Sequence, residues 1–271
     1  MKCWLNGVML DAGEARIDPR GRGFLLGDGI FETLLAVDGG VRHLPRHMAR
    51  LFAAAQLLGI AAPHSKDELA AAMAQLLQEN SLLRGRAALR LTLTRGVGAR
   101  GLAPPPNAAP SILLTAVALP PAPEQVRAIM SSYVRNEKSI SSRIKSLNYL
   151  DNIMARREAA QCGAGEALMR SSMGGLACAS AANLFVVAGG VLRTPPVSDG
   201  ALPGIMRAIV LERAAALNIP SQEASIAQKE IDAASEAFLT SALIGVCPLV
   251  QIDATPVGNG APGPVTQALR V

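Results

Sequence analysis

The alternation of strand-like and helix-like segments constrains the fold of this chain more than any other feature of its sequence. Leucines within residues 86–94 alternate with arginine and threonine, which predicts a half-buried strand. Further strands are predicted at residues 30–37, 111–118, 126–134, 166–170, 183–187, 237–240 and 249–252. Helices are predicted at residues 45–58, 66–78, 147–162 and 204–218. Strands interleaved with helices favour a mixed α/β fold.

Glycine and proline mark the turns and the boundary between two domains. An Asn-Gly pair supplies the positive φ angles of a tight turn, so residues 4–11 are predicted to form a β-hairpin. Residues 120–123, Pro-Pro-Ala-Pro, are the best candidate for a short and stiff linker. We therefore expect a smaller N-terminal α/β domain over residues 1–120 and a larger C-terminal α/β domain over residues 121–271.

Composition and charge narrow the class of protein. Half of the 271 residues are hydrophobic and 17% are charged, which is typical of a globular chain. The longest apolar stretch, residues 112–119, is too short to span a membrane, and the N-terminus has no signal-peptide segment, so we expect a cytoplasmic protein. Three histidines and four cysteines without a Cys-x-x-Cys pair argue against a metal site. The net charge of +5 comes without a Lys/Arg tract and with 3% aromatic residues, which favours small anionic ligands over nucleic acid.

One lysine of the C-terminal part, Lys145, lies between an apolar segment and the start of a predicted amphipathic helix. A lysine held partly away from water has a lowered pKa, and its amine can then form a Schiff base. Position alone favours an ordinary surface lysine. The surrounding residues 144–150, Ile-Lys-Ser-Leu-Asn-Tyr-Leu, resemble the pyridoxal-phosphate lysine motif of the class IV (fold type IV) aminotransferases. That family includes D-amino-acid and branched-chain aminotransferases and 4-amino-4-deoxychorismate lyase.

The resemblance extends over nearly the whole chain and implies a two-domain fold type IV enzyme, a homodimer that binds pyridoxal 5′-phosphate. His47-Met-Ala-Arg50-Leu resembles the family's His-x-x-Arg-Leu helix, which implies that Arg50 grips the cofactor phosphate with paired donors. A helix begins after Gly204, and its first backbone amides, those of Ile205 and Met206, would form a second part of the phosphate site. The hydroxyl of Ser241 would be the third part.

Other family motifs imply the substrate contacts. Residues 27–33, Gly-Asp-Gly-Ile-Phe-Glu-Thr, resemble the N-terminal signature and place Phe31 in the substrate pocket, together with Ala242. Two arginines on a glycine-rich loop, Arg95 and Arg100, can close over a substrate carboxylate, and in fold type IV dimers this loop commonly reaches the neighbouring subunit. The resemblance therefore predicts amino acids and 2-oxo acids as substrates.

Tyr149 follows Lys145 by four residues, which is one turn of a helix, so the two side chains are expected on the same side. In the family, a tyrosine at this place can hydrogen-bond the phenolate oxygen of the cofactor. Simple packing of the tyrosine ring explains its presence equally well.

The match breaks at one position of the segment that ends in Asn183-Leu-Phe. Five residues before this asparagine the family has a glutamate that pairs with the pyridine nitrogen of the cofactor, whereas this chain has Cys178. A charge-assisted hydrogen bond is worth about 1.5–3 kcal/mol and a thiol offers less, so the rate would drop by about one to two powers of ten. We expect a protein that binds pyridoxal phosphate but transaminates slowly.

Three functions follow from these residues. The first is a pyridoxal-phosphate-dependent aminotransferase that uses a Lys145 Schiff base. The second, favoured by the arginine-glycine loop at residues 95–101, is 4-amino-4-deoxychorismate lyase, which releases pyruvate and 4-aminobenzoate. The third is a family member that binds the cofactor but is catalytically impaired, and Cys178 is its only support.

Overall fold

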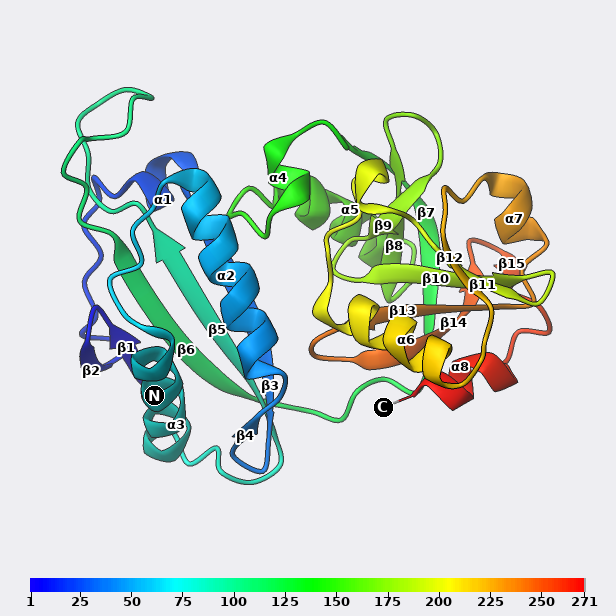
Figure 1. Cartoon of the computed structure of the whole chain (residues 1–271), viewed down its shortest axis with the longest axis horizontal. Coiled ribbons are helices and arrows are strands. Elements are labelled where there is room, and N and C mark those ends of the chain that lie inside the picture. Colours follow the sequence, from blue (N-terminus) through cyan, green and yellow to red (C-terminus); the bar gives the residue numbers. More distant parts are fainter. Residues whose placement is uncertain (271) are drawn as a thin grey trace. The chain divides into compact units, whose positions relative to one another are not determined.

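The computed structural model describes residues 1–270, and its contacts divide the chain into two compact units (Figure 1). The first unit comprises Met1–Pro121 together with Lys145–Asn148. The second comprises Ala122–Ile144 and the chain from Tyr149 onward. The C-terminal domain predicted from the sequence includes Lys145, whereas the structure groups the segment Lys145–Asn148 with the first unit.

The first unit is built on a six-stranded antiparallel sheet with the strand order β2-β1-β6-β5-β3-β4. Its strands are β1 Lys2–Leu5, β2 Val8–Asp11, β3 Gly29–Val37, β4 Gly40–Val41, β5 Arg86–Thr94 and β6 Ser111–Leu119. The long helices α2 Leu44–Leu58 and α3 Lys66–Glu79 pack against this sheet, and the short helix α1 Arg22–Leu26 precedes β3. As the alternation predicts, Leu89, Leu91 and Leu93 are fully buried while Arg90 between them is exposed.

Local sequence explains where these elements begin and end. The predicted hairpin forms between β1 and β2, with Asn6 at φ 50° and Gly7 at φ 95° in its turn. Helix α2 ends at Gly59, which adopts the left-handed conformation. Helix α3 begins with a capping box in which Ser65 and Glu68 each accept a bond from the backbone of the other.

The second unit contains a nine-stranded mixed sheet with the order β12-β11-β10-β13-β14-β7-β8-β9, and β15 pairs with β14. Its strands are β7 Val126–Arg135, β8 Glu166–Ser171, β9 Leu176–Ala179, β10 Asn183–Ala188, β11 Val191–Thr194, β12 Ser221–Glu223, β13 Glu236–Ser241, β14 Gly245–Ile252 and β15 Thr255–Pro256. The pairs β7–β8, β7–β14 and β11–β12 are parallel, and the others are antiparallel.

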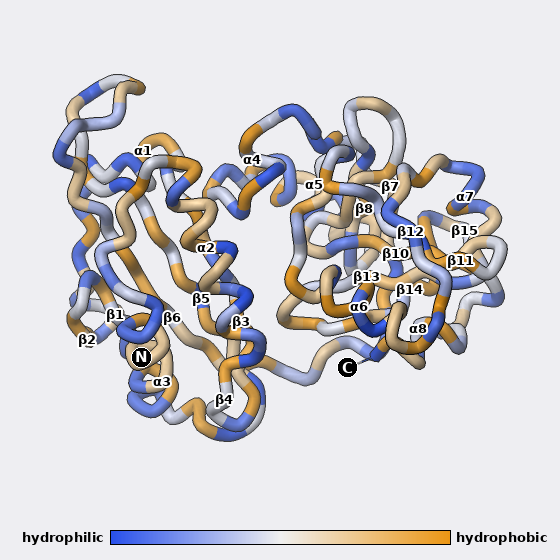
Figure 2. The backbone as a smooth tube through the Cα atoms, in the orientation of Figure 1, coloured by the Kyte–Doolittle hydropathy of each residue, from blue (hydrophilic) through white to orange (hydrophobic). Residues whose placement is uncertain are grey.

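Helices cover this second sheet and complete its core. They are α4 Ile140–Arg143, α5 Leu150–Gln161, α6 Ile205–Ala216, α7 Gln228–Asp232 and α8 Pro264–Leu269, with a 3₁₀ turn at Val197–Asp199. Helix α5 packs on β7 and β8, and α6 packs on β13. At the centre, Phe185 and Phe238 stack with their ring centroids 4.9 Å apart. Figure 2 shows long hydrophobic stretches in β13 and β14, whereas α7 is mostly hydrophilic.

The helix predicted at residues 147–162 begins later, at Leu150, so Tyr149 lies outside its helical turns. The segment before it is not helical, because Ser146 forms an isolated bridge with Ile30 and the amide of Leu147 donates to a backbone carbonyl at the start of β3. Tyr149 is the N-cap residue of α5 and does not follow Lys145 by one helical turn. The prediction that both side chains share one helix face is therefore wrong.

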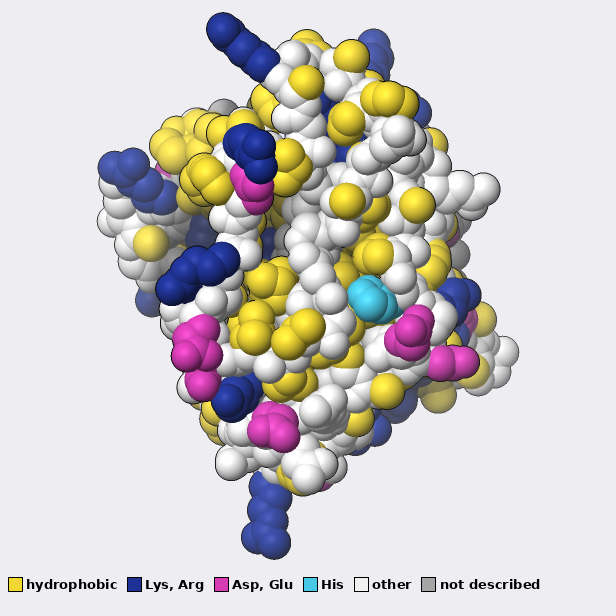
Figure 3. Space-filling view, turned by 90° about the vertical axis from the view of Figure 1, so that its left-hand side faces the viewer, with side chains coloured by type: hydrophobic (Ala, Val, Ile, Leu, Met, Phe, Trp, Pro, Cys, Tyr) yellow, Lys and Arg dark blue, Asp and Glu magenta, His cyan; other side chains and the backbone are white. Residues whose placement is uncertain are grey.

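Within residues 1–270, no helix is both long enough and apolar enough to cross a membrane. The same residues contain no group of three histidine, cysteine or acidic side chains arranged to hold a metal ion. On the face turned to the viewer in Figure 3, lysine and arginine side chains project singly, with acidic side chains between them.

Candidate active site

The predicted site residues are distributed over both units. The first unit contains Phe31, Arg50, Arg95, Arg100 and Lys145. The second unit contains Tyr149, Cys178, Asn183, Gly204, Ile205, Met206, Ser241 and Ala242.

Backbone hydrogen bonds hold Lys145 against the edge of the first sheet. The amide of Phe31 donates to the Lys145 carbonyl at 2.9 Å, and the amide of Leu147 donates to the carbonyl of Gly29 at 3.0 Å. The Lys145 side chain is half-buried, and its Nζ lies 4.3 Å from the centroid of the Phe31 ring. The face of an aromatic ring attracts such a cation. The structure therefore brings together Lys145 and Phe31, which are far apart in the sequence.

A second cation contacts the same ring. The guanidinium carbon of Arg90 lies 3.8 Å from the Phe31 centroid. Phe31 lies opposite Thr92 in the β3–β5 ladder, so its side chain and the polar side chains of β5 point to the same face of the sheet. Arg90 was not predicted as a site residue from the sequence. The only indication of its role in the sequence is that this arginine lies on the polar side of a strand with alternating residues.

Arg50 is held by a buried carboxylate. Its Nε and Nη2 each donate to one oxygen of Glu32 at 2.7 Å, and Nδ1 of His47 lies 2.7 Å from the carboxylate. Burial acts most strongly on Glu32 and raises its pKa, but the hydrogen bonds and charges of Arg50 and His47 together outweigh it, so the pKa lies below the ordinary value. The role of Glu32 was not predicted from the sequence. A charged residue in a strand that is otherwise apolar was the available signal.

In the second unit, the segment predicted to bind the cofactor phosphate is the N-terminus of α6. Gly204 is its N-cap, and a Cβ atom there would clash with Oδ1 of Asn183, so a larger residue would force the Asn183 side chain or the helix start to shift. The amides of Ile205 and Met206 belong to the first turn, where backbone N–H groups have no partner within the helix. Asn183 itself is fixed by a bond of 2.9 Å from its Nδ2 to the carbonyl of Leu202.

A buried hydroxyl lies beside this helix end. Thr240 pairs with Asn183 across β10 and β13, so the two side chains share one face. Oγ1 of Thr240 is buried and has no hydrogen-bond partner among the described residues. The neighbouring Ser241 accepts a long bond of 3.4 Å from the amide of Ile244, which leaves its hydroxyl hydrogen able to donate. An orphan hydroxyl, a donor hydroxyl and a helix N-terminus suit a phosphate group. Ala242 lies half-buried in the turn that follows.

Cys178 lies in strand β9, opposite Met169 of β8, and is buried. Burial raises the pKa of its thiol to about 11, Arg135 opposes the shift and Glu166 adds to it. Cys178 is therefore a neutral thiol at pH 7. Glu166 cannot replace a missing carboxylate, because Nη1 of Arg156 lies 2.7 Å from one of its oxygens and the hydroxyl of Ser180 donates to the other.

Arg135 at the end of β7 connects the segments around Cys178, and it was not predicted from the sequence. It is buried and donates to Oδ1 of Asn152 at 3.0 Å and to the carbonyls of Gly200, Ser141 and Ser142 at 3.3–3.4 Å. The strand end, the start of α5 and the turn before α6 are thus joined by one guanidinium.

The two loop arginines differ. Arg95 is buried, and its guanidinium donates to Asp28 and to the carbonyls of Leu58 and Gly59 at 2.8–3.2 Å. All three of its nitrogens are thereby engaged, so the expectation that Arg95 takes a substrate carboxylate does not fit this geometry. Arg100 is exposed on the loop and stays a candidate.

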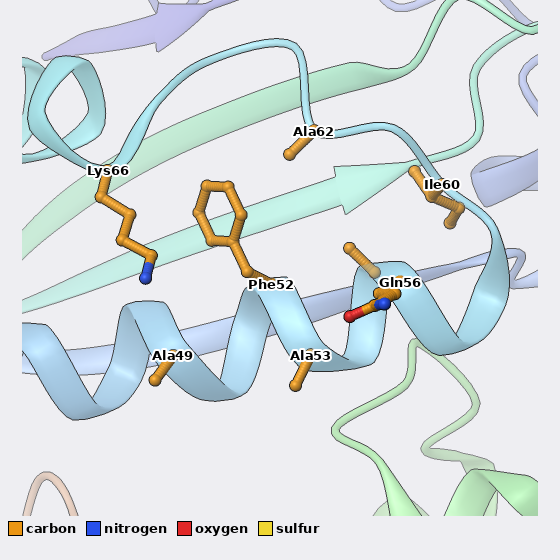
Figure 4. A pocket seen from close by; sticks show the side chains of 8 residues that line it. Ala49, Phe52, Ala53, Gln56, Ile60, Ala62 and Lys66 are labelled. Carbon is orange, nitrogen blue, oxygen red and sulfur yellow. The ribbon is translucent and has the colours of Figure 1, made fainter.

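A separate pocket of about 570 Å³ lies in the first unit, between α2 and the segment that leads to α3 (Figure 4). Its lining includes Phe52 and Gln56 of α2, with Nζ of Lys66 5.6 Å from the centroid of the Phe52 ring. The remaining lining residues are apolar, and none of the predicted site residues contributes to it. This pocket lacks the groups that the predicted chemistry needs.

Comparisons with known proteins identify the family and the fold of this chain. Residues 29–252 match the family model for amino-transferase class IV. The chain is 34% identical to a Methanocaldococcus jannaschii protein named as a branched-chain-amino-acid aminotransferase, over 100% of this chain and 94% of the relative. It is 31% identical to a D-alanine aminotransferase of Listeria monocytogenes, again over 100% of this chain and 94% of the relative.

Solved structures extend the similarity to the fold. The branched-chain aminotransferase of Thermoproteus uzoniensis, solved with norvaline, matches with a TM-score of 0.92 and 31% identity, over 100% of this chain and 92% of that chain. A Legionella pneumophila structure described as a 4-amino-4-deoxychorismate lyase matches with a TM-score of 0.88 and 29% identity, over 96% and 94%. The mixed α/β fold predicted from the sequence is confirmed.

Proposed function

Because the chain belongs to the class IV aminotransferase family, we propose that it transfers amino groups between an amino acid and a 2-oxo acid, with pyridoxal 5′-phosphate bound at Lys145. The observation that carries this proposal is the position of Nζ of Lys145, 4.3 Å from the Phe31 ring that Arg90 also contacts. An amine and a guanidinium that contact one aromatic ring supply a base and a carboxylate binder for a small amino acid.

The residues that would hold the cofactor fit a phosphate ester. Arg50 would bind phosphate with a guanidinium that Glu32 already orients. The amides of Ile205 and Met206 and the hydroxyl of Ser241 would donate to the phosphate oxygens, and the orphan hydroxyl of Thr240 would gain a partner. When bound, pyridoxal phosphate supplies an aldehyde that joins amino groups and a ring that withdraws electrons from the substrate Cα.

Lys145 would first hold the cofactor and then act as the base. Once a substrate amine has replaced Lys145 on the cofactor, Nζ of Lys145 would take the proton from the substrate Cα. The same amine would then give this proton to the former aldehyde carbon of the cofactor. The backbone bond between Lys145 and β3 restricts the positions that this amine can reach, and the ring of Phe31 lies directly beside the amine. Tyr149 remains our candidate for a hydrogen bond to the cofactor's phenolate oxygen.

We assign the substrate carboxylate to guanidinium groups. Arg90 stands on the Lys145 side of the sheet and can bind a carboxylate with two parallel bonds, which Phe31 cannot. Arg100 is a second candidate, and it would act in a homodimer at the site of the neighbouring subunit.

Cys178 determines the rate of amino-group transfer that we expect. A neutral thiol supplies no negative charge, so the ring nitrogen of the cofactor would lose the support that a carboxylate provides. We propose an enzyme that binds its cofactor normally but transfers amino groups slowly.

A visible spectrum of the purified protein, titrated with D- and L-amino acids, tests this function. Loss of the cofactor's absorbance with one enantiomer, and its return on adding a 2-oxo acid, is the expected result. A protein that holds the cofactor but shows no change with any amino donor is an impaired family member, and the proposal then fails.

The second candidate function is 4-amino-4-deoxychorismate lyase. The observation in its favour is the similarity to the Legionella pneumophila structure, combined with an exposed arginine on the glycine-rich loop. Incubation with aminodeoxychorismate separates the two activities, because the lyase releases pyruvate and 4-aminobenzoate in the absence of any 2-oxo acid.

A further inference from the structure

The loop that carries Arg100 is held by hydrogen bonds from a buried arginine in a different part of the chain. Arg22 lies at the start of α1 and is 5% exposed. Its Nη1 donates to the carbonyl of Gly101 at 2.9 Å and its Nη2 to the carbonyl of Leu102 at 2.9 Å. A longer bond of 3.3 Å joins Nη1 to the carbonyl of Ala103. Three successive carbonyls of the loop thus accept hydrogen bonds from one side chain.

Asp28 forms an ion pair with this buried guanidinium and connects it to the base of the loop. Its Oδ2 lies 2.7 Å from Nε of Arg22 and 2.8 Å from Nε of Arg95. Burial is the largest single influence on the pKa of Asp28 and acts to raise it. The hydrogen bonds and charges of Arg95 and Arg22 together outweigh burial, so the pKa of Asp28 lies below its ordinary value. Because Arg95 also donates to the carbonyls of Leu58 and Gly59, the start of the loop is tied to the end of α2.

The loop backbone packs closely around the same side chain. The amide of Arg22 donates to the carbonyl of Gly96 at 2.8 Å, and Gly21 forms an isolated bridge with Val97. A Cβ atom at Gly98 would lie 2.9 Å from Cδ of Arg22, so a larger residue would push the loop away. Both ends of residues 96–103 therefore contact Arg22.

We propose that Arg22 is a positioning residue for Arg100: it keeps residues 96–103 in one conformation, so that the exposed Arg100 guanidinium is in place before a carboxylate arrives. This rests on the proposed function, in which Arg100 is the second candidate, beside Arg90, for binding the substrate carboxylate. Without the hydrogen bonds from Arg22, the loop would lose conformational freedom each time a substrate binds, and the affinity for the substrate would fall. The chemical step would change less, because the proton transfers belong to Lys145 and not to the loop.

The variant Arg22→Lys tests the proposal. Lysine keeps a positive charge beside Asp28, but one ammonium group lacks the fork that reaches the carboxylate and three carbonyls together. Arg20→Lys makes the same chemical change two residues away, at an exposed arginine, and serves as the control. We expect tryptic cleavage after Arg100 to become about tenfold faster in Arg22→Lys and to stay unchanged in the control.

Kinetics distinguish positioning from general stabilisation. We expect Arg22→Lys to raise KM for the carboxylate substrates about tenfold while kcat falls less than about threefold. In an Arg100→Ala background the same change should raise KM no further. Unchanged cleavage after Arg100, or an equal rise in KM in the Arg100→Ala background, overturns the proposal.

The cleavage rate is independent of turnover. If the wild-type protein transfers no amino group, the proposed function fails, yet faster cleavage in Arg22→Lys still shows that Arg22 holds the loop. If the protein is active and the cleavage rate does not change, the proposed function stands and the role of Arg22 falls.

Discussion

At the scale of single residues, the most consequential position is Cys178. Its thiol is buried, and burial raises its pKa to about 11 even though Arg135 lies near enough to oppose the shift. The nearby carboxylate of Glu166 is committed to Arg156 and Ser180. Cys178 therefore brings no negative charge to this point of the second unit, whereas the family's glutamate does.

Replacing Cys178 with glutamate should accelerate the reaction. A carboxylate beside Arg135 gains an ion pair, and we expect the half-reaction with an amino donor to become about 10–100-fold faster. Stopped-flow absorbance measures this rate. Cys178→Ser, which is similar in size and uncharged, is the control and should stay slow. A glutamate variant no faster than wild type would show that Cys178 does not limit the reaction.

Glu32 makes the stability of the first unit depend on pH. Burial opposes its ionisation, yet Arg50 and His47 lower its pKa below the ordinary value of 4.5. A lowered carboxyl pKa stabilises the folded state above the unfolded-state pKa, and this contribution disappears as the pH falls through the folded-state value. We expect the urea midpoint of the wild type to fall more between about pH 7 and about pH 3 than that of Glu32→Gln. Equal falls in both proteins would contradict the assignment.

At the scale of elements, the phosphate site depends on how closely α6 approaches β10. Gly204→Ala would place a methyl group against Oδ1 of Asn183, and such overpacking costs about 1–3 kcal/mol. We expect weaker retention of pyridoxal phosphate on dialysis, because the first amides of α6 shift. Gly175→Ala, where the nearest atom is 3.5 Å away, is the matched control. Equal retention in both variants would place the phosphate elsewhere.

Periodic patterns predicted most of these elements but not their short connections. The alternating leucines of β5 and the bracketing residues of α2 were sufficient, because each reports a local preference over many residues. Strand β9 has four residues and no alternation, so it could not be found. The helix at α5 was predicted three residues too early, because the bridge of Ser146 to Ile30 is a long-range contact that leaves no local signal.

The residues of the candidate site were also predicted only where local sequence reports them. Motifs identified Lys145 and the start of α6, since both have recognisable neighbours in the chain. Arg90 and Glu32 were missed because their roles come from pairing between β3 and β5 and from packing against α2. The contacts of Arg95 could not be predicted either, because its partners Leu58 and Gly59 lie far away in sequence.

At the scale of the whole molecule, we propose that two copies share each active site. If Arg100 acts in the neighbouring subunit, mixing Lys145→Ala chains with Arg100→Ala chains should restore activity at low substrate concentration. Random exchange of subunits gives heterodimers with one intact site, so about a quarter of the wild-type activity is expected. If Arg100 acts within its own chain, the mixture recovers nothing.

The position of the cofactor is the claim on which the other proposals depend, and reduction with borohydride tests it most directly. Protein loaded with pyridoxal 5′-phosphate is reduced, digested and analysed by mass spectrometry. We expect the phosphopyridoxyl group on the peptide that contains Lys145, and its absence from that peptide in Lys145→Ala. An unmodified Lys145, or a label on another lysine, would contradict the account.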